Sequence, residues 1–169
     1  MSISMYDVSI PMMTLGLTNL TAILDKAAAH AADKKFDSLV LAQARLFPDM
    51  YPLARQVQIA CDTAKGAAAR LAGIEVPKHE DTETTLAELK ARIAKTVDFL
   101  KSVTPAQLKD AESRAIEIKF PNGSWKFTGI AYLSDFALPN FYFHVSMVYA
   151  LLRKNGVDIG KMDFLGAIQ

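Results

Sequence analysis

The feature that most constrains this chain is a helical period in its apolar residues, which recurs in four long segments. Apolar side chains spaced by three and four residues line one face of a helix, and that face must be buried against another element. The expected helices cover about residues 11–32, about 50–72, a segment after Asp81 with its apolar stripe from Leu86 to Leu100, and about 132–154, with a short helix near 39–44. Four such helices predict a bundle.

Residues typical of helix ends support these boundaries. Ser9 and Asp49 are candidate N-caps for the first and second long helices. Gly73 lies where a helix can end in the left-handed conformation. Thr85 and Glu88 have the spacing of a capping box at the start of the third long helix, although Thr82 or Thr84 could be the cap instead.

One short region has a different period. Apolar residues alternate with polar ones on both sides of Asn122-Gly123, a pattern that predicts a β-hairpin at about residues 114–128. A lone hairpin is only marginally stable, so we expect it to pack on the helices. The predicted fold is therefore all-α: an up-and-down four-helix bundle with a small β-hairpin before the last helix, in a single domain over residues 1–169.

The last helix and the tail carry two further expectations. Pro139 could bend the helix, and Asn155-Gly156 is its stop signal. The tail, residues 157–169, is too apolar to hang free, so it should dock on the protein or on a second subunit.

Composition excludes several classes of protein. With 51% apolar and 22% charged residues, the chain is neither disordered nor fibrous. A net charge of +1 removes the simplest argument for a nucleic-acid or anionic-membrane partner. A single cysteine, Cys61, forbids an intrachain disulfide and favours a reducing compartment. No membrane-spanning segment or secretory signal is evident, so a cytoplasmic location is expected.

The most informative polar residues are on the last helix. At about 100° per residue, Asn140 and His144 lie together on its most apolar stripe. Such a histidine is either a core residue satisfied by a hydrogen bond or part of a ligand or metal site. On the second long helix, Gln56 borders the apolar face, whereas Gln58 and Asp62 point away from it.

The remaining candidates have simpler interpretations. His30 and His79 are expected in solvent, and Cys61 is expected to be an inert apolar residue. A mostly solvated face of the third long helix carries Lys90, Arg92, Lys95 and Asp98. No phosphate-binding glycine loop or paired-cysteine zinc spacing is present.

Several strings resemble an uncharacterised family of bacterial and fungal proteins. They run from Phe47 to Met50, from Pro52 to Asp62, from Ala69 to Gly73, from Pro139 to His144, from Leu151 to Val157 and from Gly160 to Gly166, and Tyr132-Leu133 belongs with them. This domain-of-unknown-function family is similar to a branch of the DinB/YfiT-like superfamily of metalloenzymes. The resemblance implies a four-helix bundle, often dimeric, and some relatives transfer low-molecular-weight thiols or isomerise small acids.

The resemblance also implies where a metal would lie. The best-defined relatives use three histidines, of which a pair on the last helix corresponds here to Asn140 and His144. The third corresponds to a position near Ile59 or Ala60, where this sequence has no histidine. We therefore expect no metal cofactor. If zinc or nickel were held, its ligands would be His144, Asn140 and Asp62, with Gln56 and Gln58 as other possible replacements.

Three functions stay open. The leading hypothesis is a metal-free protein that binds a small molecule in an inter-helix pocket, with His144, Asn140 and Gln56 as candidate contacts. The alternatives are a metal-dependent thiol or small-molecule transferase with substituted ligands, and a structural or accessory protein. Whether the chain is an enzyme is not decided. A homodimer is expected, because the small-residue stripe of the second long helix and the apolar tail exceed what a monomer needs to expose.

Overall fold

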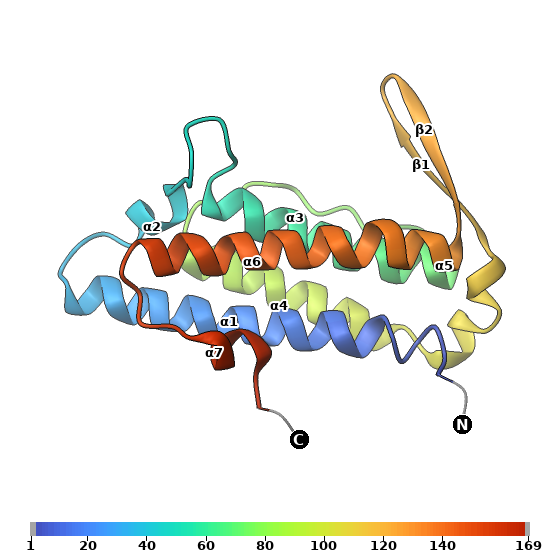
Figure 1. The fold of residues 1–169 in the computed structure, drawn as a ribbon, viewed down its shortest axis with the longest axis horizontal. Coiled ribbons are helices and arrows are strands. Elements are labelled where there is room, and N and C mark those ends of the chain that lie inside the picture. Colours follow the sequence, from blue (N-terminus) through green and yellow to red (C-terminus); the bar gives the residue numbers. More distant parts are fainter. Residues whose placement is uncertain (1–2, 168–169) are drawn as a thin grey trace.

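Four long helices lie side by side in the computed structural model, which describes residues 3–167 (Figure 1). They are α1 (Ile10–Asp33), α3 (Leu53–Ala72), α4 (Leu86–Ser102) and α6 (Leu138–Lys154). Shorter elements are α2 (Leu39–Gln43), the 3-10 helices η1 (Pro105–Leu108) and η2 (Ala111–Ser113), strands β1 (Ala115–Phe120) and β2 (Gly123–Thr128), α5 (Gly129–Ala131), the π-helical turn η3 (Tyr132–Ala137) and α7 (Lys161–Leu165). The predicted helical bundle with a hairpin before its last helix is confirmed.

The expected up-and-down order, in which successive long helices alternate in direction, is wrong at one connection. Residues 73–85 return along the length of the bundle, so α4 starts beside the start of α3 and runs parallel to it (Figure 1). Gln58 of α3 contacts Glu83 just before α4, and Asp62, further along α3, contacts Arg92 within α4. We call residues 73–85 the crossover.

The helix caps follow the predictions in part. Thr85 and Glu88 form the predicted capping box, and Gly73 ends α3 with φ 69°, in the left-handed region. Ser9 makes no cap bond, because its hydroxyl donates to the Met5 carbonyl instead. The expected start near Met50 with Asp49 as cap is wrong, since α3 begins at Leu53 after the extended Pro52.

The hairpin forms where predicted but does not lie on the helices as expected. Phe120 pairs with Gly123, so the two turn residues are Pro121 and Asn122 rather than Asn122 and Gly123. The hairpin projects from the bundle (Figure 1), and Trp125 is 51% exposed. Its buried anchor is Ile116, near the base.

Aromatic rings attach the hairpin to the start of the last helix. The Trp125 ring lies edge-on to Phe136, with 5.7 Å between centroids, and Phe136 stacks on Tyr132 at 5.9 Å. Tyr132 is fully buried and accepts a hydrogen bond from Arg70 of α3. These contacts hold the projecting hairpin without covering its faces.

The last helix begins earlier than predicted and is irregular before Pro139. It starts at Gly129 and passes through the π-helical turn before the regular α6. Pro139 has no N–H to donate to the carbonyl of Asp135, which is consistent with a wider turn at this point. The predicted stop is confirmed, because Asn155 caps α6 and Gly156 has φ 84°.

Two surfaces from which a dimer was expected are covered within the monomer. Of the 20 residues of α3, 15 are buried, so its small-residue stripe is core. The tail docks on α1, where Asn19 donates to the Phe164 carbonyl and Lys26 pairs with Asp163 at 2.7 Å; its last two residues lie outside the described part. These two surfaces therefore give no reason to expect a dimer. Across residues 3–167, no helix has the length and apolar character that crossing a bilayer requires.

Candidate functional site

A buried hydrogen bond joins the two long helices that meet at the centre of the bundle. His144 of α6 is 8% exposed, and its Nδ1 lies 2.7 Å from Oε1 of Gln56 on α3. The Gln56 amide nitrogen donates to the Tyr51 carbonyl at 3.1 Å, which turns Oε1 toward His144. Because an amide oxygen can only accept, the proton of the neutral ring must be on Nδ1.

This arrangement leaves the other ring nitrogen of His144 unprotonated. Within residues 3–167 no hydrogen bond reaches Nε2, and the atom is not among the fully buried atoms that lack a partner, so it keeps access to solvent. Burial lowers the pKa of His144, and the positive charge of Arg55 lowers it further. His144 is therefore a neutral imidazole whose Nε2 lone pair can accept a hydrogen bond or a proton.

Asn140 lies on the same side of α6 but has a different partner. Its amide donates to the Thr63 hydroxyl at 2.7 Å, further along α3. The structure thus brings His144 and Gln56 together, as predicted, and joins Asn140 to Thr63 instead of to the histidine.

A second polar cluster lies on the other side of α3, and the sequence analysis missed it. Arg92 of α4 was expected in solvent, but its side chain is 1% exposed. Its guanidinium contacts Asp62 at 2.8 Å, Asp81 at 2.9 Å and Glu83 at 3.1 Å. We call Arg92 and these three carboxylates the Arg92 cluster.

The crossover explains why the expectation that this side of α3 faces solvent was wrong. It covers the side of α3 that the wheel assigned to solvent, so Gln58 is 5% exposed and donates to Glu83 at 3.1 Å. Asp62 keeps a 36% exposed side chain but pairs with Lys65, which is buried, at 2.9 Å. The one available signal was the pair of carboxylates, Asp81 and Glu83, placed just before a helix that carries an arginine on its polar face.

Two atoms near this cluster are buried without a hydrogen-bond partner among the described residues. They are Arg92 Nε and Nδ1 of His79, a residue predicted to be in solvent but half-buried here. Burial lowers the pKa of His79, and Lys65, Lys95 and Arg92 add to the effect. His30 is also half-buried, edge-on to Phe36.

The environment of Cys61 agrees with the prediction of an inert thiol. The residue is fully buried, and burial raises its pKa to about 12. A thiol of that pKa is not deprotonated near neutrality, so it is a poor nucleophile and a poor metal ligand.

The donor groups do not fit the three-ligand metal site that the superfamily implies. Within residues 3–167, no three His, Cys, Asp or Glu side chains are grouped closely enough to hold an ion. The Asn140 amide is bonded to Thr63, and Asp62 is neutralised by Arg92 and Lys65. His144 could offer only one nitrogen, and a catalytic zinc site needs three protein ligands.

Comparison with known proteins gives a family and a fold. The family model of a domain of unknown function (DUF1993) matches residues 5–165. The chain is similar to the crystal structure of a DinB family member protein from Shewanella denitrificans, with 46% sequence identity and a TM-score of 0.90 over 96% of this chain and 92% of that one. A search of curated proteins found no match.

Proposed function

The chain belongs to the DUF1993 family and shares the DinB fold, and from that premise we propose that it binds a small molecule at His144 without a metal ion. One observation carries the proposal. Two consecutive hydrogen bonds, from the Gln56 amide to the Tyr51 carbonyl and from His144 Nδ1 to Gln56 Oε1, hold His144 in a single neutral tautomer. Among the described residues, no protein group bonds to Nε2. Fixing one ring nitrogen by a hydrogen bond is how proteins orient the other for binding or catalysis.

The chemistry of Nε2 defines the ligand. An unprotonated ring nitrogen accepts hydrogen bonds, so the ligand carries an O–H or N–H group that points at His144. The same nitrogen can remove that proton, because a neutral histidine is a general base near pH 7. Gln56 would position the ring in either role and would not contact the ligand.

The ligand test uses matched histidine variants. A thermal-shift screen of small alcohols, phenols, amides and thiols should yield compounds that stabilise the wild type. His144→Leu should abolish these shifts, whereas His30→Leu, at a half-buried histidine elsewhere, should keep them. Equal shifts in all three proteins would contradict binding at His144.

A second measurement tests the geometry without a ligand. In ¹⁵N NMR spectra of the imidazole nitrogens, His144 should show the Nδ1-protonated tautomer, and Gln56→Ala should release this preference. A predominant Nε2-protonated form in the wild type would remove the basis of the proposal.

We propose that no metal takes part, because the other candidate ligands are already bonded to protein. Elemental analysis of protein purified in the presence of zinc and nickel should show well below one ion per chain. About one ion per chain, lost in His144→Ala, would instead support the metal-dependent alternative.

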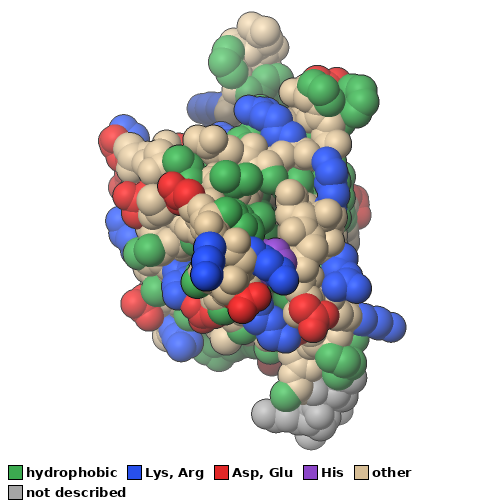
Figure 2. All heavy atoms as spheres, turned by 90° about the vertical axis from the view of Figure 1, so that its left-hand side faces the viewer, with side chains coloured by type: hydrophobic (Ala, Val, Ile, Leu, Met, Phe, Trp, Pro, Cys, Tyr) green, Lys and Arg blue, Asp and Glu red, His purple; other side chains and the backbone are tan. Residues whose placement is uncertain are grey.

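We also propose a homodimer, formed through projections that lie on one side of the bundle. The loop of residues 44–52 and the hairpin both extend from that side (Figure 1). Figure 2 shows hydrophobic side chains on the projections and a mixture of acidic and basic side chains over the end of the bundle. Phe47 is 63% exposed and Trp125 is 51% exposed, and aromatic surface of this kind is typical of interfaces.

Light scattering at micromolar concentration should therefore give the mass of two chains. Phe47→Ser combined with Trp125→Ser should give one chain, and Ile74→Ser, at an exposed site on the crossover, should not change the mass. A monomeric wild type would contradict the proposed dimer.

A further inference from the structure

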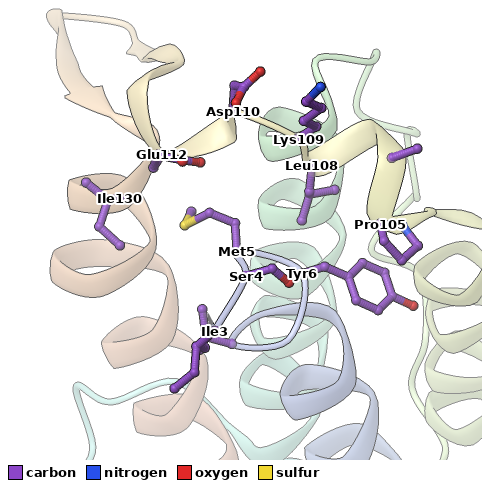
Figure 3. Close-up of a pocket in the computed structure, with 12 residues that line it drawn as sticks. Ile3, Ser4, Met5, Tyr6, Pro105, Leu108, Lys109, Asp110, Glu112 and Ile130 are labelled. Carbon is purple, nitrogen blue, oxygen red and sulfur yellow. The ribbon is translucent and has the colours of Figure 1, made fainter. Parts of the chain in front are cut away.

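A hollow lies at the end of the bundle where α1 begins and where the chain passes from α4 into η1 and η2. Its volume is about 760 Å³, within the range of small-molecule sites. Three segments line it: residues 3–8, residues 105–112 and Ile130 at the start of the last helix (Figure 3). None of these residues belongs to the His144 site.

The walls of the hollow are held in place by local contacts. The Ser9 hydroxyl donates to the Met5 carbonyl at 2.6 Å, and the Ser4 amide donates to the Asp7 carboxylate at 3.0 Å, which fixes the segment before α1. On the opposite wall, Gly129 approaches Ala111 so closely that a Cβ atom would lie 1.8 Å from the Ala111 oxygen.

That close approach brings two lining side chains together. Ile130 follows Gly129, and Glu112 follows Ala111, so the glycine places an apolar and an acidic side chain next to each other at the hollow. Any larger residue at 129 would push these walls apart. The hollow is therefore formed before a ligand arrives, which lowers the entropic cost of binding.

The lining is mostly apolar, and one acidic side chain extends over it. Met5 and Leu108 are buried, whereas Ile130 is 48% exposed at the edge. In Figure 3 the side chains of Lys109 and Asp110 point out of the hollow, and Glu112 extends over it. Among residues 3–167, Glu112 takes part in no ion pair, and no hydrogen bond reaches its carboxylate.

We propose that this hollow binds a small primary amine that carries an alkyl chain. The alkyl chain would cover Met5, Leu108 and Ile130, removing exposed apolar surface from water. The ammonium group would pair with the exposed Glu112, which has no cationic partner among the described residues. Met5 suits such a site because its flexible thioether adapts to ligands of different shape.

The test compares three ligands of one chain length: octylamine, octanol and octanoate. With ¹³C-methyl-labelled methionine, the Met5 methyl signal should shift saturably with octylamine, less with octanol and least with octanoate. The signal of Met162, on α7, is the internal control. No shift of the Met5 signal with octylamine, or tighter binding of octanoate than of octylamine, would overturn the proposal.

Two variants test the separate contributions. Glu112→Gln should weaken octylamine binding about threefold to fivefold, as expected for a solvent-accessible ion pair, and should leave octanol binding unchanged. Ile130→Ser should weaken both ligands, and Glu75→Gln, at an exposed glutamate of the crossover, should affect neither. An equal effect of Glu112→Gln on the amine and the alcohol would contradict the role of the carboxylate. His144→Leu should leave octylamine binding intact, so the two proposed sites can fail independently.

Discussion

Helix α3 buries polar groups on two sides, and the two sides use different chemistry. Toward α6 the contacts are neutral: Gln56 with His144 and Thr63 with Asn140. Toward α4 and the crossover they are ionic and converge on Arg92, whose guanidinium meets three carboxylates. A helix of mostly small residues can thus be packed closely on one side through amides and an imidazole, and on the other through charges.

The two sides of α3 differ in the free-energy cost of removing one member of a polar contact. A neutral group that loses its partner costs about 1–3 kcal/mol, and His144 retains access to solvent. A buried ion that loses its counter-ion leaves an uncompensated charge, which costs more. The Arg92 cluster is therefore the more sensitive of the two to substitution, and the His144 pair is free to serve a ligand.

The largest effect should come from Arg92→Met. The three carboxylates would lose their common cation, and the crossover would lose its main attachment to α4. We expect the free energy of unfolding to fall by about 3 kcal/mol, the lower end for breaking a buried ion pair, because Asp62 and Asp81 are partly exposed. Denaturation in urea measures it, with Lys34→Met, at an exposed lysine, as the control. Equal stability of the two variants would remove the contrast between the two sides of α3.

A smaller effect should appear on acidification. The pKa of His144 in the folded protein is below its ordinary value of 6.5, so the unfolded chain takes up a proton first as the pH falls. The stability present above pH 6.5 should therefore be lost progressively below it, and His79, whose pKa is also lowered, adds to the loss. Unfolding curves between about pH 7.5 and 5 measure this slope. His144→Gln should make it shallower, and an unchanged slope would mean that His144 is not buried in its neutral form.

Converting the neutral pair into a charged one should reverse that dependence. In Gln56→Glu, a carboxylate would accept from Nδ1 and favour the imidazolium, so the pKa of His144 should rise. If it rises above that of the unfolded chain, the added stability is present at low pH and lost as the pH rises. An NMR titration of the His144 ring measures the change, with Gln58→Glu, on the other side of α3, as the control. A lowered pKa would show that desolvation outweighs the new charge pair.

The smallest effect should come from Lys65→Met. Its side chain is 5% exposed but contacts only Asp62 among the described ion pairs, and Asp62 would keep Arg92. Loss of the pair should be offset by packing of the methionine, so the free energy of unfolding should change by less than about 1 kcal/mol. A loss as large as that of Arg92→Met, again measured in urea, would show that the cluster depends on both cations.

The contrast between the two sides of α3 also marks the limit of sequence-based prediction. His144 and Gln56 were predictable because each lies on or beside an apolar stripe, and two apolar stripes must face each other. The hairpin was predictable from its alternation, although its projection from the bundle was not. The alternation of apolar and polar residues predicts that two strands pair. It does not say whether the hairpin lies on the helices or projects from them, because that depends on contacts such as that of Trp125 with Phe136.

Arg92, Gln58 and Asp62 could not be placed from the sequence because their burial depends on a segment without periodic structure. The helical wheel assigns a polar face to water unless another element covers it, and the path of the crossover is not encoded in the spacing of any one helix. Whether a metal site is present could likewise be predicted only in part. The missing histidines were evident, but only the structure shows that Asn140 and Asp62 already have partners.

The return of the crossover has a consequence for the order in which the protein can assemble. Consecutive long helices usually pair as local hairpins, which form quickly because little chain separates them. Here α3 and α4 run parallel, so they cannot form such a hairpin, and α1 meets α4 through Lys90 and Asp25 and meets α7 through Asp163 and Lys26. During synthesis the first helix must therefore wait for α4, and then for the end of the chain, before its apolar face is fully covered. We expect refolding to be slower than that of a bundle of equal length built from adjacent hairpins, with an early intermediate that exposes α1.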